Sequence, residues 1–156
     1  MTDTFHGEDE RAVVVRVGSA EFGVDVTHVR EVLRLPTITR LPFPPPTILG
    51  IVSVRGTLVP VMDLGLRLLD TAASREGRLV VVWDPESDGV VGLLVDEVLD
   101  LVPLDVAAHA VPPEVAASLP EGWIRGVLAP TSERLVTLLD LPHVLDVQTP
   151  AAEESR

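Results

Sequence analysis

The feature that most constrains the fold is a succession of short β-branched runs, separated by turn residues at close intervals. Residues 48–54 and 57–62 are the clearest pair, because Arg55-Gly56 lies between them and glycine supplies the backbone freedom of a hairpin turn. The whole chain gives about ten such strands and only short helices. Helices of about ten or more residues would be needed between parallel strands, so the pattern predicts an all-β barrel or sandwich.

The remaining apolar runs predict the secondary structure of most of the chain. We expect further strands at 12–17, 21–26, 79–83, 90–95, 123–128 and 134–139. The run 79–83 is apolar on both sides, which places it where two layers meet. Val29, Val32 and Leu33 follow Thr27 at helical spacing and predict a short helix over 28–34. Residues 106–120 form an irregular crossover, with one helical turn at most.

Composition excludes several classes of protein. The 156 residues suffice for one domain, and the lack of cysteine rules out disulfides and a cysteine nucleophile. The net charge of −12 repels phosphate backbones, so we expect no nucleic-acid partner. No apolar run reaches the roughly 20 residues of a membrane span and no secretory signal precedes the first strand, so we expect a cytoplasmic protein that does not insert into membranes.

Searches for catalytic and metal sites give negative results. Asp84, Glu86 and Asp88 match the start of a calcium loop, but Val95 stands where the bidentate glutamate is required. The four histidines show no metal-ligand spacing: His6, His28, His109 and His143. Nucleotide-binding loops and nucleophile elbows are absent from the sequence, and Asp63 reads as a helix cap. We therefore expect a non-catalytic, protein-binding module with no metal and no cofactor.

Six fragments in chain order resemble the successive motifs of the CheW family. They are FGVDV from residue 22, VREV from 29, ITRLP from 38, LGIVSVRG from 49, VPVMDL from 59 and VGLLVDEV from 91. IRGV from residue 124 and LLDL from 138 extend the match, which covers about 12–147. Two positions depart from the family pattern: the turn reads Ser53-Val54-Arg55-Gly56 where Asn-Leu-Arg-Gly is common, and Gly65 replaces a frequent arginine.

The resemblance implies two packed five-stranded β-barrels of the Src-homology-3 type. The first subdomain is expected at about 18–78 and the second at about 11–17 plus 79–147, with the first strand joining the second barrel. Residues 1–10 are expected to be a disordered acidic segment and 148–156 a flexible tail, and Met1 with two frayed ends suggests a complete small protein.

The resemblance also implies a function. It describes an adaptor that couples chemoreceptors to the histidine kinase CheA in a bacterial chemosensory array, with the receptor's cytoplasmic tip and the kinase's regulatory domain as partners. Such an adaptor is cytoplasmic and is recruited to membrane-associated receptor arrays. The alternatives are a CheW-like regulatory module of another chemosensory or kinase pathway, and a small-molecule-binding barrel.

Position by position, the resemblance assigns two surfaces. The receptor-facing groove comprises Val29, Glu31, Gly50, Arg55 and Gly56. The kinase-facing surface centres on Gly126, with exposed parts of Trp123 or Ile124 beside it. Arg55 is isolated among apolar residues and Glu31 is its nearest acidic candidate, so we expect these two to form a partly buried ion pair.

Overall fold

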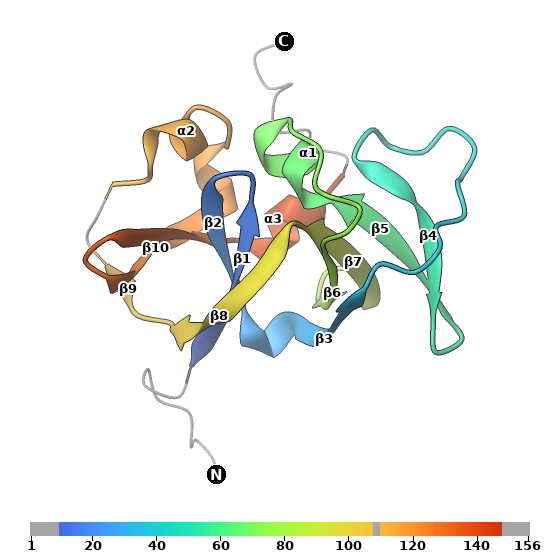
Figure 1. Ribbon diagram of the computed structural model, residues 1–156, viewed down its shortest axis with the longest axis horizontal. Coiled ribbons are helices and arrows are strands. Elements are labelled where there is room, and N and C mark those ends of the chain that lie inside the picture. The colour runs from blue at the N-terminus through green and yellow to red at the C-terminus, as the bar shows by residue number, and fades with distance from the viewer. Residues whose placement is uncertain (1–9, 108–109, 148–156) are drawn as a thin grey trace.

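The computed structural model describes residues 10–107 and 110–147. Two β-sheets lie side by side, and the helices are short (Figure 1). The expected N-terminal segment 1–10, apart from Glu10, and the expected tail 148–156 lie outside the described residues. Within the described part of the chain, no helix has the length and apolar character needed to cross a membrane.

The six-stranded sheet has the order β8-β1-β2-β11-β10-β9. Its strands are β1 (Arg11–Val17), β2 (Ala20–Asp25), β8 (Glu97–Pro103), β9 (Val106–Ala107), β10 (Ile124–Thr131) and β11 (Arg134–Leu139). Its crossover contains α2 (Pro113–Ala116) and a 3-10 turn, Glu121–Trp123, and its last helix is α3 (Leu141–Leu145). The single helical turn expected in the crossover is confirmed.

The five-stranded sheet has the order β3-β6-β7-β5-β4. Its strands are β3 (Val29–Arg34), β4 (Ile48–Val54), β5 (Thr57–Asp63), β6 (Arg78–Asp84) and β7 (Gly89–Val95), and α1 (Leu64–Leu69) follows β5. The three expected hairpins, β4-β5, β6-β7 and β10-β11, are confirmed as antiparallel pairs. The acidic segment between β6 and β7 is a hairpin turn, as its sequence indicates.

The sheets divide the chain differently from the expected boundaries at 18 and 79. The strand β1 does join the six-stranded sheet of the second subdomain, but β2 stays with it because the two form a tight antiparallel hairpin. The hairpin β6-β7 belongs instead to the five-stranded sheet, where β6 pairs with β3 and β7 with β5. The sheet of the second subdomain also has six strands rather than the expected five, because the two-residue β9 adds to its edge.

Most of the segment 28–34, expected to be a helix, is the strand β3, which begins at Val29. Its residues alternate between half-buried and exposed, the period-2 pattern of a strand, and it pairs with β6 over most of its length. The helical structure in this region is instead a 3-10 turn just before the strand, Val26–His28. Asp25 caps this turn by accepting a hydrogen bond from the Thr27 N–H. Burial raises the pKa of the Asp25 carboxyl, but hydrogen bonds from Thr27 and Arg125 outweigh it and hold the pKa below its usual value.

The core lies largely between the two sheets. Phe22 from β2, Val80 from β6 and Leu93 from β7 belong to one buried cluster that joins both sheets. Leu79 and Val81, on the other face of β6, belong to a second cluster inside the five-stranded barrel. The expectation that residues 79–83 lie where two layers meet is confirmed, because β6 is buried on both faces.

The helix α1 fastens the two sheets to each other. The buried Asp63 caps it, accepting hydrogen bonds from the backbone N–H groups of Leu66 and Ala73, while burial raises the pKa of this carboxyl above its usual value. Arg67 on α1 is also buried, and its Nε donates to the Val144 carbonyl in α3, 2.9 Å away. The Arg67 guanidinium lies over the Trp123 ring, 4.5 Å from the ring centroid.

Candidate partner-binding surface

The residues expected to form the receptor groove come from two strands that are far apart in the sheet order. β3 carries Val29 and Glu31, while β4 carries Gly50 and leads to Arg55 and Gly56 at the hairpin tip. These strands form the opposite edges of the five-stranded sheet. The sheet curls so that both edges meet the same connection, 35–47, and this curvature brings Glu31 and Arg55 together.

The ion pair links the hairpin tip to a strand, not to a helix as expected. Arg55 Nη1 donates to Glu31 Oε2, but the Arg55 side chain is 77% exposed and the Glu31 side chain 27% exposed. Arg55 and Gly56 both have positive φ, 51° and 83°, which is the backbone of a type I′ hairpin turn. The tip therefore projects the guanidinium into solvent, and only the carboxylate end of the pair is partly buried.

This exposure changes the expected energy of the pair. An exposed ion pair contributes under about 1 kcal/mol to stability, whereas a buried pair loses about 3–5 kcal/mol when one partner is removed. In a double-mutant cycle with Glu31→Ala and Arg55→Ala, we expect a coupling energy below about 1 kcal/mol, measured by urea unfolding. A coupling of about 3 kcal/mol would mean that the pair is buried in solution.

Gly50 shapes this surface from below. It is buried, has φ of 153°, and a Cβ built on it would lie 2.3 Å from the Thr39 carbonyl oxygen and 2.6 Å from Ile38 Cγ2. The Thr39 segment is fixed there by two backbone hydrogen bonds with Ile51, each 2.8 Å long. Gly50 therefore allows the connection to pack against β4, and it offers no side chain to a partner.

Exposed apolar side chains near this surface were missed by the sequence reasoning. Leu58, on β5 just after the tip, is 69% exposed, and Val32 on β3 is 43% exposed. Leu58 was assigned to a largely buried strand and Val32 to one face of a helix, because an apolar residue by itself shows no sign of which face it occupies. Val29 is half-buried and packs against the core between the sheets.

The residues expected on the kinase-facing surface have different environments. Trp123 is 2% exposed and packs beneath Arg67, so the expectation that it is partly exposed is wrong. Its ring fills the space between α1 and α3, the kind of site that a large aromatic side chain fills in a core. Ile124 is half-buried against the same cluster. Gly126 lies on β10, and a Cβ on it would be 2.7 Å from Val106 Cγ1 of β9.

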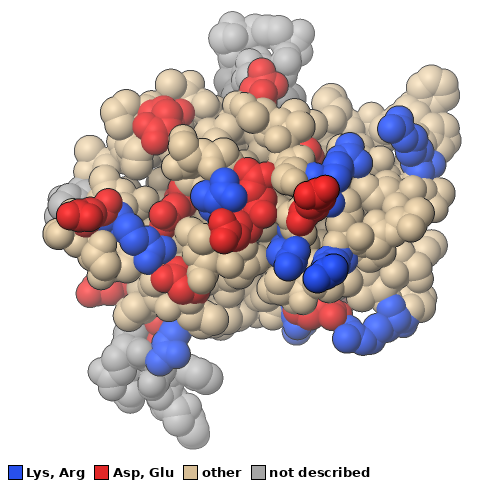
Figure 2. Space-filling model, in the orientation of Figure 1, with Lys and Arg blue, Asp and Glu red and all other residues tan. Residues whose placement is uncertain are grey.

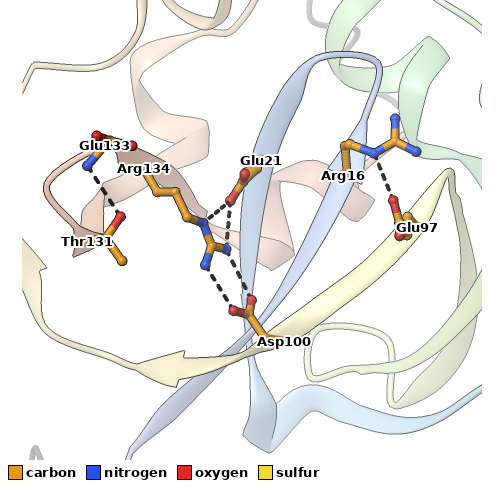
Figure 3. Close-up of polar contacts among 7 residues, drawn as sticks. All are labelled: Arg16, Glu21, Glu97, Asp100, Thr131, Glu133 and Arg134. Carbon is orange, nitrogen blue, oxygen red and sulfur yellow. Dashed lines mark hydrogen bonds and ion pairs between the residues drawn. The ribbon is translucent and has the colours of Figure 1, made fainter.

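The six-stranded sheet carries its own exposed apolar and paired charged residues. Leu101 on β8 and Val106 on β9, the two edge strands, are each 54% exposed. Arg134 on β11 donates to Glu21 of β2 and, with two nitrogens, to Asp100 of β8 (Figure 3). These hydrogen bonds, the pair with Asp100 first, raise the pKa of Arg134 above its usual value. Arg134 is thus neutralised by two carboxylates from neighbouring strands.

The fold and these surfaces can be compared with known proteins. The family model described as the CheW-like domain matches residues 11–149, nearly the whole chain. The chain belongs to this family. A relative named "Probable chemotaxis protein CheW" from Rhizobium etli is 32% identical over 133 residues, covering 85% of each chain. "Chemotaxis protein CheW" from Rhizobium meliloti is 33% identical and covers 85% of this chain and 84% of that protein.

A CheW-like relative with another name matches at similar identity. "Protein FrzA" from Myxococcus xanthus is 34% identical over 131 residues, covering 83% of this chain and 81% of that protein. Among solved structures, the scaffolding protein TtCheW from Thermoanaerobacter tengcongensis superposes with a TM-score of 0.76 over 97% of both chains, at 23% identity. The expected fold of two packed, Src-homology-3-like β subdomains agrees with this likeness.

Two further features of the described residues concern small ligands: the placement of metal-ligating side chains and the interior of the five-stranded barrel. Among residues 10–107 and 110–147, no group of three or more histidine or acidic side chains is positioned to hold a metal ion. The interior of the five-stranded barrel is filled by apolar side chains: Val52, Val59, Val61, Leu79 and Leu94. A filled interior disfavours the small-molecule-binding barrel.

Proposed function

We propose that this protein is a non-catalytic adaptor that couples the cytoplasmic tips of chemoreceptors to a CheA-type histidine kinase. The observation that carries the proposal is the family match over residues 11–149, together with relatives that bear the name CheW. In this role the protein acts in the cytoplasm and joins membrane-associated receptor arrays without inserting into the bilayer.

The receptor surface is proposed to lie around the Glu31–Arg55 pair. Gly50 and Gly56 shape the hairpin there, and Val29 with the exposed Leu58 supplies apolar area. Contact at this surface combines burial of apolar groups, worth roughly 25 cal/mol per Å² before the costs of association, with one oriented guanidinium. The exposure of Arg55 supports this role, because its side chain is available to a partner.

The kinase surface is proposed to lie on the six-stranded sheet, near Gly126 and the half-buried Ile124. Two sheets with exposed apolar residues on separate edges supply two contact regions, and a coupling protein needs both at once. Trp123 is left out of this surface because it is buried. Its part is to hold the helix and sheet packing beneath the surface.

Arg55→Ala should weaken receptor binding and spare kinase binding. We expect about a tenfold loss of affinity for a receptor-tip fragment, the effect of losing about 1.4 kcal/mol, and less than about a twofold change for the kinase regulatory domain. Titration calorimetry measures both affinities. Arg16→Ala is the matched control, because Arg16 pairs with Glu97 on the other sheet. Loss of kinase binding with receptor binding intact would reverse the assignment of surfaces.

The same titration separates the pathway alternatives. A relative that is not named CheW matches at similar identity, so a CheW-like regulatory module of another chemosensory or kinase pathway is the second candidate. Tight binding to a kinase regulatory domain combined with no binding to any chemoreceptor tip would favour that second candidate over the proposed one.

A further inference from the structure

A surface groove with four arginines runs along the five-stranded half of the molecule. It consists of two adjacent hollows, of about 490 and 410 Å³, that share Leu35 and Arg75 in their lining. We call it the arginine groove. Its apolar and cationic lining includes Ile38, Leu41, Leu49, Arg34, Arg40 and Arg78.

The floor of the arginine groove is held firmly by the barrel. Leu35, Ile38 and Leu49 pack against the buried cluster inside the five-stranded sheet. The connection that carries Ile38 is fixed to β4 through the backbone pairing of Thr39 with Ile51. A groove with a preformed apolar floor can bury part of a ligand at little ordering cost.

The arginines around the groove lack the carboxylate partners that four other arginines have. Arg16, Arg55, Arg125 and Arg134 each have a carboxylate oxygen within 4.0 Å. Among the residues that the structure describes, the four groove arginines have none.

What the groove arginines do contact is limited. Arg78 donates to the backbone oxygen of Gly77, 3.0 Å away. The positive charge of Arg75 acts on the buried Asp63 carboxyl from a distance and lowers its pKa, against the larger effect of burial. The lining of the two hollows contains one carboxylate, that of Glu76, so it presents an excess of positive charge.

This excess runs against the charge of the whole protein. The chain has 24 acidic and 12 basic residues, yet a third of the basic residues surround one groove without acidic partners. Figure 2 shows the contrast on one face: acidic side chains dominate the half with the six-stranded sheet, and basic side chains are more frequent over the other half. A cationic groove on a protein whose other half is acidic favours a ligand with a short, local run of negative charge that fits within the groove.

We propose that the arginine groove docks an acidic, amphipathic segment of a partner protein. Guanidinium groups bind carboxylates through two parallel hydrogen bonds, and the apolar floor accepts the side chains between those carboxylates. The surrounding negative field disfavours long polyanions such as nucleic acids, whose charge would extend over the acidic surface. The groove lies at the start of β4, while Arg55 lies past its end, about 20 Å further along a seven-residue strand. The groove is therefore distinct from the Glu31–Arg55 pair, and it borders the proposed receptor surface at Gly50, which lies against Ile38. The inference does not rest on the adaptor role.

The test uses short fluorescein-labelled peptides and the full-length chain. In one peptide glutamate alternates with leucine, and in the other glutamine replaces every glutamate. By fluorescence anisotropy we expect the acidic peptide to bind at least about tenfold more tightly than its glutamine counterpart. The double variant Arg40→Gln/Arg75→Gln should lose about tenfold in affinity for the acidic peptide, and raising salt to about 0.5 M should have a similar effect because the groove is open to solvent.

The control changes net charge equally elsewhere. Arg11→Gln/Arg16→Gln lies on β1 of the other sheet and should leave peptide affinity within about twofold of wild type. Each single groove variant is measured as well, so a poorly folded double variant does not decide the result. The proposal is overturned if both double variants weaken binding equally, if the glutamine peptide binds as well as the acidic one, or if a single-stranded oligonucleotide binds the groove more tightly than the peptide.

Discussion

Replacing Arg67 by alanine is expected to lower the free energy of unfolding by about 3–5 kcal/mol. Arg67 is 5% exposed on α1, and it donates to the carbonyl oxygens of Val144 and Asp146 near α3. Removing the side chain leaves the buried Val144 carbonyl without this donor, at about 1–3 kcal/mol, and takes a donor from the part-buried Asp146 carbonyl. It also removes the cation–π contact with Trp123. Burying a cation also costs desolvation free energy, and the variant avoids this cost, so part of the loss of stability is offset.

Chemical unfolding followed by tryptophan fluorescence measures the effect. Arg16→Ala is the matched control, because Arg16 is a half-exposed arginine paired with Glu97, and it should change stability by less than about 1 kcal/mol. Arg67→Met retains the apolar stem and should recover only part of the loss, since the two carbonyl oxygens still lack their donor. An Arg67→Ala variant as stable as wild type would show that α1 and α3 do not depend on this contact.

Gly50→Ala is expected to cost about 2–5 kcal/mol of stability. Its Cβ would lie 2.3 Å from a backbone oxygen of Thr39, and its φ of 153° is strained for any residue with a side chain. Relief requires moving the connection and breaking the hydrogen bonds between Thr39 and Ile51, so overpacking and backbone strain act together, at about 1–3 kcal/mol each.

A second glycine gives the control for this prediction. A Cβ on Gly122 would meet no atom within 4 Å, and its φ lies outside the positive range, so Gly122→Ala should stay within about 0.5 kcal/mol of wild type. The unfolding midpoints of both variants are compared at an unchanged denaturant slope. Equal, small effects at the two sites would mean that the connection yields to the added methyl group, and Gly50 would then lose its structural role.

Much of the fold could be predicted from local pattern. β-Branched runs flanking a glycine turn specify hairpins by themselves, and Asp63 before an apolar turn specifies a cap, so both were assigned correctly. The strand β3 was missed because Val29, Val32 and Leu33 fit a helical spacing as well as an extended one. Its pairing partner, β6, lies almost 50 residues further on, and nothing local reveals it.

The division into subdomains depends on pairings of longer range. β2 pairs with β11 in parallel, as Phe22 pairs with Thr137, and β5 pairs with β7 in parallel in the other sheet. In each sheet a hairpin is followed by a short helix, α1 after Asp63 and α3 after Asp140. The fragments VMDLGLRLL and TLLDLPHVL carry this repeat in the sequence, and comparing them could have placed the boundary after β2.

The candidate site was predicted in part. The isolated charge of Arg55 and the family resemblance together pointed to Glu31, and the two side chains are in contact. Their exposure could not be read from the sequence, because a hairpin tip between apolar strands can be covered or can project into solvent. The burial of Arg67 and Trp123 was equally hidden, since α3, which covers them, follows β11 at the end of the described chain.

The proposed adaptor role requires one copy of this protein to hold a receptor and a kinase at the same time. Sedimentation velocity of a mixture of this protein, a receptor-tip fragment and a CheA regulatory domain tests it directly. The proposed separation of the two surfaces on different sheets predicts a species that contains all three components, and Arg55→Ala should release only the receptor fragment. If adding the receptor fragment instead displaced the kinase domain, the two partners would share one surface and the adaptor role would be contradicted.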